Sequence, residues 1–231
     1  MPRTDAPDAL SPDEALERLR EGNRRFVAGE GSAVRQWHPG LTDGQWPFAV
    51  ILGCADSRAP AEYVFDQGLG DLFVVRVAGN IVAPSLVGSV EFAASEFGTR
   101  LVVVMGHTQC GAVAATLRAI ERSDGPSSSN VRSIVDRIAP HLARLYDERR
   151  DDTLDEGARL VEAIRINALA SARELRDSSA LVHDLVERGR VKIVAAVYDL
   201  ATGVVSFHQD AVGAEAEGTG DRPSTQWRFL P

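Results

Sequence analysis

Short apolar runs along the chain alternate with longer segments in which apolar residues recur at helical spacing. The apolar runs are almost continuous and rich in β-branched residues, which is typical of strands covered on both faces of a parallel sheet. They occupy residues 48–53, 72–78, 101–105, 191–198 and 204–208. The intervening segments predict helices at residues 85–97, 111–121, 131–149, 158–177 and 180–188. Strands that alternate with helices predict an α/β fold with a mainly parallel central sheet flanked by helices.

Both ends of the chain add detail to this fold. Ser11 and Glu14 are placed to form a capping box, so we expect an N-terminal helical arm over about residues 12–28. A turn at 199–203 precedes the last apolar run, which we expect to be an antiparallel edge strand near the C-terminus. Residues 210–231 are mostly polar and form a tail. The sequence contains no internal repeat, and no linker separates the arm from a core at about 45–208. We therefore expect residues 1–231 to form a single domain.

Charge and hydropathy limit the partners of this chain. Lys and Arg number 25 and Asp and Glu number 33, which gives a net charge of −8 at pH 7. Such a chain lacks the basic surface that binds nucleic acid and is not attracted to an anionic membrane. No apolar run reaches the roughly 18 residues of a spanning helix, and the first residues lack the apolar stretch of a secretory signal. We therefore expect a cytoplasmic protein with no nucleic-acid or membrane partner.

The chain has only two cysteines, Cys54 and Cys110, and each follows a predicted strand. A reducing cytosol disfavours a disulfide, so two buried thiols that pack as small apolar groups are the simplest interpretation. The carboxyl ends of parallel strands, however, meet at one edge of a sheet, where binding sites form. His107, three residues before Cys110, belongs to the same edge. Two Cys and one His suit Zn²⁺, and three protein ligands leave one tetrahedral position open, as in catalytic zinc sites.

Two charged residues stand close to the first cysteine. Asp56 can accept a hydrogen bond from a metal-bound water, and Arg58 can hold that carboxylate with two hydrogen bonds and keep it ionised. The alternative is a surface ion pair of little energetic value. The remaining histidines lie at no spacing typical of metal ligands and are left unassigned: His38, His141, His183 and His208.

Three motifs of the chain resemble the β-class carbonic anhydrases. They are CADSR at 54–58, VRVAGN at 75–80 and GHTQCGAV at 106–113. Shorter matches extend the resemblance over roughly residues 12–208: EGNRRFV at 21–27, FDQGLGDLFVVR at 65–76 and VYDLATG at 197–203. The resemblance implies that Cys54, His107 and Cys110 bind one Zn²⁺ per subunit. It also implies that Asp56 and Arg58 form a catalytic dyad.

The activity implied by this resemblance is the reversible hydration of CO₂ to bicarbonate and a proton, by attack of a zinc-bound hydroxide. Family members line a narrow CO₂ pocket with residues of two subunits. Gln45, nine residues before the first zinc cysteine, stands where the family has a glutamine that enters the partner's site. Phe73 matches a pocket phenylalanine, Phe92 stands where many relatives have tyrosine, and Gly111 follows the last ligand as in the family. The working unit is then a homodimer or a larger homo-oligomer.

One departure from the family concerns regulation. Some relatives carry a regulatory bicarbonate site built from a tryptophan, an arginine and a tyrosine. Arg76 and Tyr198 resemble two of these residues, but Ile51 replaces the tryptophan. This substitution speaks against bicarbonate inhibition at that position.

Two other functions could use the same ligands. A zinc hydrolase that acts on another small heterocumulene, such as carbon disulfide, would differ mainly in access to the pocket. A bicarbonate- or zinc-sensing module without turnover would be favoured by substitutions in the dyad, but Asp56 and Arg58 are both present. A thiol redox protein is disfavoured because the chain has no Cys-x-x-Cys motif.

Overall fold

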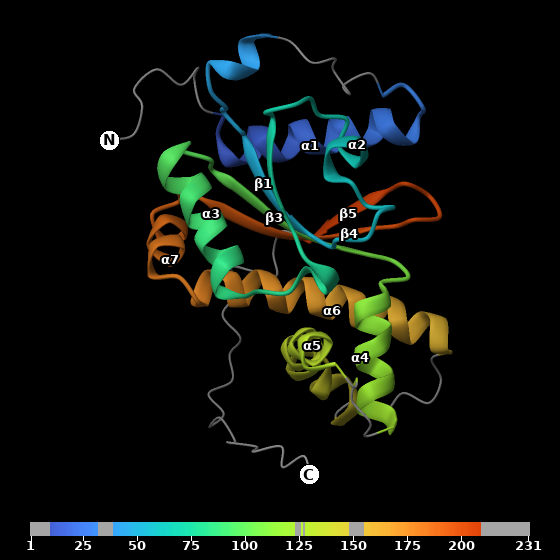
Figure 1. The fold of residues 1–231 in the computed structure, drawn as a ribbon. Helices are drawn as coiled ribbons and strands as arrows, with labels where there is room; N and C mark the ends of the chain where they lie inside the picture. The colour runs from blue at the N-terminus through green and yellow to red at the C-terminus, as the bar shows by residue number, and fades with distance from the viewer. Residues whose placement is uncertain (1–9, 32–38, 123–125, 127, 148–154, 209–231) are drawn as a thin grey trace.

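The computed structural model of the chain describes residues 10–31, 39–122, 126, 128–147 and 155–208 (Figure 1). The predicted tail at 210–231, the first nine residues and His38 lie outside this part of the chain. Among the described helices, none combines the length and the apolar character needed to cross a membrane.

A five-stranded sheet with the order β2-β1-β3-β4-β5 organises the described part of the chain. The strands are β1 (Ala49–Gly53), β2 (Leu72–Arg76), β3 (Leu101–His107), β4 (Lys192–Tyr198) and β5 (Val205–His208). β1 pairs in parallel with β2 and β3, β3 pairs in parallel with β4, and β5 runs antiparallel to β4. The predicted α/β fold, with a mainly parallel sheet and an antiparallel edge strand near the C-terminus, is confirmed.

Helices cover both faces of this sheet (Figure 1). On one face lie α1 (Pro12–Val27) and the short α2 (Ala61–Val64). On the other lie α3 (Pro84–Glu96), α6 (Glu156–Asp177) and α7 (Ala180–Glu187), while α4 (Gly111–Arg122) and α5 (Ser129–Asp147) pack against α6. Two 3₁₀ turns, at Pro39–Thr42 and Ala78–Asn80, complete the described elements. The predicted strands and long helices begin and end close to the observed ones, whereas α2 and both 3₁₀ turns were not predicted.

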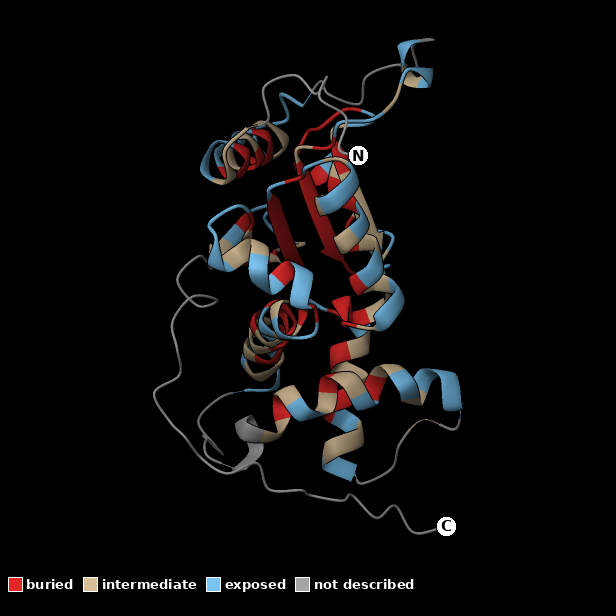
Figure 2. Cartoon of the chain, turned by 90° about the vertical axis from the view of Figure 1, so that its left-hand side faces the viewer, coloured by how far each residue is buried: buried red, intermediate tan, exposed pale blue. Residues whose placement is uncertain are grey.

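Side chains of β1 and β3 enter two separate cores, and both strands are drawn in the colour of buried residues (Figure 2). Ile51 and Val103 belong to the core under α1, and Val50 and Val104 belong to the core under α3, α6 and α7. Every residue of β1 and of β3 is buried. Because both faces of these strands are covered, no polar face is needed, and this explains the continuous apolar runs in the sequence.

The N-terminal helix is held on the sheet of its own chain by Asn23, which is buried. The Asn23 amide donates to the carbonyls of Val64 (3.1 Å) and Gly203 (2.9 Å). Its Oδ1 accepts a hydrogen bond of 2.9 Å from the Val205 N–H. One side chain therefore joins α1, the end of α2 and the turn before β5. The predicted capping box at the start of α1 is also present.

We expect Gly22→Ala to lower the free energy of unfolding by about 3 kcal/mol, because an added Cβ would lie 1.8 Å from the Phe65 carbonyl oxygen. The matched control is Gly88→Ala in α3, where an added Cβ meets no heavy atom within 4 Å. That substitution should be neutral or stabilising by up to about 1 kcal/mol. Urea unfolding followed by circular dichroism measures both changes. Equal stability of the two variants would contradict the close approach of α1 to Phe65.

Candidate metal centre

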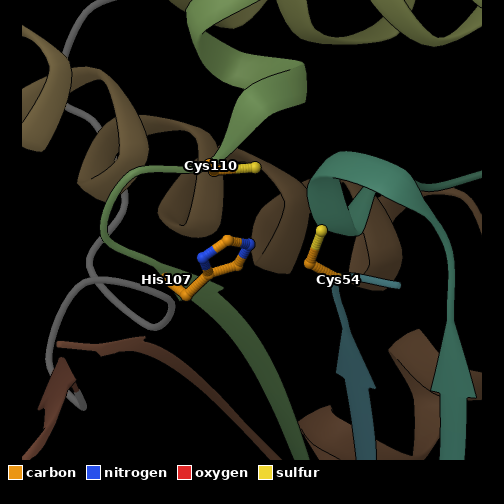
Figure 3. Close-up of side chains that lie close together, drawn as sticks. All are labelled: Cys54, His107 and Cys110. Carbon is orange, nitrogen blue, oxygen red and sulfur yellow. The ribbon is translucent and has the colours of Figure 1, made fainter. Parts of the chain in front are cut away.

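Three potential metal ligands meet where the parallel strands end (Figure 3). Cys54 directly follows β1, His107 is the last residue of β3, and Cys110 immediately precedes α4. Their ligand atoms all lie within 4.8 Å of one another, and all three residues are buried. Within the described ranges, no other group of three such side chains could hold a metal ion. The pairing of Gly53 with Met105 explains why the three side chains lie together, because it brings the residues after β1 beside the end of β3.

A tight turn carries the chain from His107 to Cys110. Thr108 anchors this turn, since its hydroxyl donates to Asp199 Oδ1 (3.1 Å) and accepts from the Leu200 N–H (2.9 Å). Gln109 adopts a left-handed conformation with a φ of 59°, which turns the chain sharply into α4. The Cys110 thiol then stands at the amino end of α4, beside Gly111 and the first N–H groups of that helix. The positive end of a helix dipole stabilises a thiolate there.

The His107 ring has one nitrogen free to bind a cation. Its Nδ1 lies 2.9 Å from the Thr108 carbonyl oxygen, which can only accept, so Nδ1 carries the proton and donates. The lone pair is then on Nε2. This atom is buried and has no hydrogen-bond partner in the described part of the chain. A buried nitrogen acceptor without a donor, close to two sulfurs, fits a metal ligand.

The two thiols are close enough to affect each other's acidity. The neighbouring Cys110 and the Gly79 N–H, at 3.3 Å from the sulfur, lower the pKa of Cys54 below that of an ordinary thiol, although burial opposes this. The same contact and burial raise the pKa of Cys110. Two thiolates this close together repel each other, so a divalent cation beside them favours the loss of both protons. Two thiols and an imidazole that accommodate a divalent ion in this way suit Zn²⁺.

Asp56 and Arg58 form a closely matched ion pair beside the ligand group. Arg58 Nε donates to Asp56 Oδ1 (2.9 Å), Arg58 Nη2 donates to Oδ2 (2.8 Å), and the Arg58 backbone N–H adds a bond of 2.9 Å to Oδ1. These contacts hold the pKa of the Asp56 carboxyl well below its usual range. Asp56 Oδ2 lies 3.8 Å from His107 Nε2. An ionised carboxylate is thus held next to the candidate metal ligands without being one of them.

Arg76 has a role at this edge that sequence reasoning missed. Its Nε donates to the Cys54 carbonyl (3.0 Å) and its Nη2 donates to the Asp56 carbonyl (2.6 Å). One guanidinium therefore holds the backbone at the first ligand and two residues after it. The sequence signal was the VRVAGN motif, which contains Arg76 and Gly79, but a motif does not say which carbonyls an arginine reaches.

Three of the expected pocket residues lie away from the ligand group of their own chain. Gln45 is exposed and precedes the amino end of β1, whereas the ligands lie beyond its carboxyl end. Phe73 lies near the amino end of β2 and packs with Phe92 and Phe97, at ring-centroid distances of 6.5 and 5.9 Å. Phe92 is 51% exposed. Only Gly111, next to Cys110, adjoins the ligands within one chain.

Two thiols, an imidazole and a fixed carboxylate at one point on the edge of a mainly parallel α/β sheet are typical of an enzyme with a Cys₂His metal site. Comparison with known proteins names its family. The family model described as carbonic anhydrase matches residues 49–205. Carbonic anhydrase 2 of Mycobacterium tuberculosis is 39% identical to this chain over 215 residues, which cover 89% of this chain and 98% of that protein.

A carbonic anhydrase of Mycolicibacterium smegmatis is 40% identical over 200 residues, covering 85% of this chain and 93% of that protein. A solved β-carbonic anhydrase of Aspergillus fumigatus superposes with a TM-score of 0.66 at 25% identity, over 89% of this chain and 92% of that one. The chain therefore belongs to the carbonic anhydrase family, in its β class.

We expect His107→Ala to weaken Zn²⁺ binding by about 100-fold or more, because a ligand with an otherwise unpartnered buried nitrogen is lost. The matched control is His183→Ala, which removes an exposed histidine of α7 and should leave the affinity unchanged. Competition with a chromophoric chelator measures both affinities. Retention of wild-type affinity by His107→Ala would rule out this residue as a ligand.

Proposed function

We propose that this chain catalyses the zinc-dependent reversible hydration of CO₂ to bicarbonate and a proton. The observation that carries the proposal is the group of three buried ligand atoms within 4.8 Å of one another. Cys54, His107 and Cys110 would hold one Zn²⁺ per subunit. Three protein ligands suit a catalytic zinc, because the fourth tetrahedral position stays available to water or substrate. The names of the relatives agree with this activity.

Zn²⁺ bound there would supply the Lewis acidity that makes a water molecule a nucleophile near neutral pH. The protein's part is to fix the ligands before the reaction. Thr108 sets the tautomer of His107, and Arg76 fixes the backbone carbonyls of Cys54 and Asp56. A ligand set with rigid positions keeps its geometry through the reaction, and little reorganisation is then needed in the transition state.

In this proposal Asp56 and Arg58 orient the attacking water. Asp56 Oδ2, at 3.8 Å from His107 Nε2, is close enough to the ligands to accept a hydrogen bond from a water beside them. That bond fixes the proton of the water and leaves a lone pair directed toward the carbon of CO₂. Arg58 keeps the carboxylate ionised and in place through its paired hydrogen bonds. The orientation is therefore established before CO₂ arrives.

We further propose that Gln45, Phe73 and Phe92 line the pocket of the partner subunit, while Gly111 lines the pocket of its own. Their distance from the ligands of their own chain supports an action in the partner. Phe92 is 51% exposed and Trp46, which follows Gln45, is 40% exposed, and a second copy of the chain would cover these apolar side chains. The working unit is then a homodimer or a larger homo-oligomer.

A cytoplasmic location remains a prediction. It is supported by the two free cysteines, which act as metal ligands only where thiols stay reduced. Cell fractionation with an antibody against the chain tests this location.

We expect the wild-type enzyme to hydrate CO₂, and Asp56→Asn to lower kcat/KM by about 100-fold or more with unchanged zinc content, because the water loses its negatively charged acceptor. Stopped-flow measurement with a pH indicator, and metal analysis on the same samples, test this. The matched control is Asp136→Asn, an exposed aspartate of α5, which should keep full activity.

Three results would contradict the proposal in different ways. Full activity of Asp56→Asn would remove its role in catalysis. Loss of zinc from that variant would make Asp56 a metal ligand. Turnover of carbon disulfide without turnover of CO₂ would leave the metal site in place but assign it to a different hydrolase.

We expect subunits with Cys54→Ser and subunits with Gln45→Ala, each nearly inactive alone, to recover about a quarter of wild-type activity when they are co-expressed in equal amounts. Half of the randomly paired dimers are then mixed, and each mixed dimer has one site with intact ligands and an intact partner glutamine. The stopped-flow assay on the purified mixture measures the recovery. No recovery would mean that Gln45 acts only within its own subunit.

A further inference from the structure

A chain of polar contacts leads from the protein surface to the Cys54 sulfur. Glu174 Oε2 lies 3.2 Å from His141 Nε2. His141 Nδ1 lies 3.1 Å from Asn167 Oδ1, and Asn167 Nδ2 donates to the Gly79 carbonyl at 2.9 Å. The Gly79 N–H in turn donates to Cys54 Sγ at 3.3 Å. Residues of α5, α6 and the turn after β2 are thus connected to a candidate metal ligand.

The direction of the Asn167 amide in this chain follows from its partners. A carbonyl oxygen only accepts, so Asn167 must direct its NH₂ group toward Gly79 and its oxygen toward His141. His141 Nδ1 therefore donates to Asn167 Oδ1. Asn167 is completely buried, so water does not compete for either bond. His141, with only 15% of its side chain exposed, donates to the amide oxygen and so supports this orientation of the buried amide.

The backbone at Gly79 needs a contact from outside its own turn to keep its N–H in one direction. Its φ is 73°, in the left-handed region that favours glycine. A Cβ at this position would lie 2.7 Å from Ile138 Cδ1 and 3.1 Å from Ala112 Cβ, so a larger residue does not fit. Glycine has the greatest backbone freedom of all residues, and the turn alone does not hold its N–H in one direction. The bond from Asn167 to the Gly79 carbonyl supplies that constraint.

We propose that Asn167 is a positioning residue of the metal centre, with its amide oriented by His141, and that it acts by keeping the Gly79 N–H on the Cys54 thiolate. An N–H···S bond withdraws electron density from the sulfur. The thiolate then donates less charge to a bound metal, and the acidity of that metal is preserved. The inference rests on the proposed metal centre and adds residues that neither bind the metal nor touch the substrate.

The test uses Co²⁺ in place of Zn²⁺, because the energy of the thiolate-to-cobalt charge-transfer band reports the electron density on sulfur. We expect Asn167→Asp and His141→Leu to move this band to longer wavelength. Both should also weaken Zn²⁺ binding by about 10-fold, as measured by chelator competition. Asn167→Asp keeps the size of the side chain but loses the donor to Gly79. His141→Leu changes a partly exposed position, and thermal unfolding of both variants checks that they are folded.

Two further variants separate positioning from packing. His141→Gln keeps a donor that can reach Asn167 Oδ1, so it should restore the wild-type band and affinity. Ser171→Ala removes another buried polar group of α6, one whose hydroxyl has no hydrogen-bond partner among the described residues, and it should change neither quantity.

The possible results distinguish this inference from the proposal on which it rests. A wild-type protein that binds Co²⁺ without a thiolate band would overturn the metal centre, and the inference with it. A wild-type band that stays unchanged in folded Asn167→Asp and His141→Leu would overturn the inference alone. A His141→Gln variant that behaves like His141→Leu would show that His141 does not orient the amide.

Discussion

Parallel pairing of β1 with β3 places Gly53 beside Met105, and the position of every candidate ligand depends on that register. The side chains of a strand alternate between faces, so a shift by one residue would move the residues after β1 away from the end of β3. Two apolar cores, one on each face, oppose such a shift, because it would turn the side chains of each core toward the other face and disrupt the packing of both. The same packing that stabilises the sheet therefore determines the geometry of the metal centre.

Charge is the second constraint at this edge of the sheet. Two thiolates in a buried site repel each other, and the protein offsets this repulsion with fixed dipoles. The Gly79 N–H is directed at Cys54, and the amino end of α4 is directed at Cys110. Arg58 and Arg76 add positive charge outside the ligand group, on the Asp56 carboxylate and on nearby carbonyls. The surroundings can thus accept a divalent ion without a further acidic ligand.

Local sequence patterns predicted most of the elements but not the contacts between distant ones. The strands and long helices have clear apolar periodicity, and the capping box at Ser11 is a local signal. α2 has only four residues, too few for any period, and the turn at Gly79 depends on Ile138 and Ala112, which lie far along the chain. The ligand set was predictable because the end of a parallel strand is a known place for binding residues. Asn167 lies in the middle of a helix, and no sequence pattern marked it as a residue of the site.

The sequence by itself determined the alternation of strands and helices, the Asp56–Arg58 pair and the three candidate ligands, because these depend on periodicity, on short spacings and on the places where strands end. Only the tertiary structure decided that His107 Nε2 is the nitrogen free to bind a metal, that Arg76 holds the carbonyls around Cys54, and that Asn167 reaches Gly79. Each of these contacts joins residues that are brought together in space by packing. A buried polar group reaches its hydrogen-bond partner only when the core around it has formed.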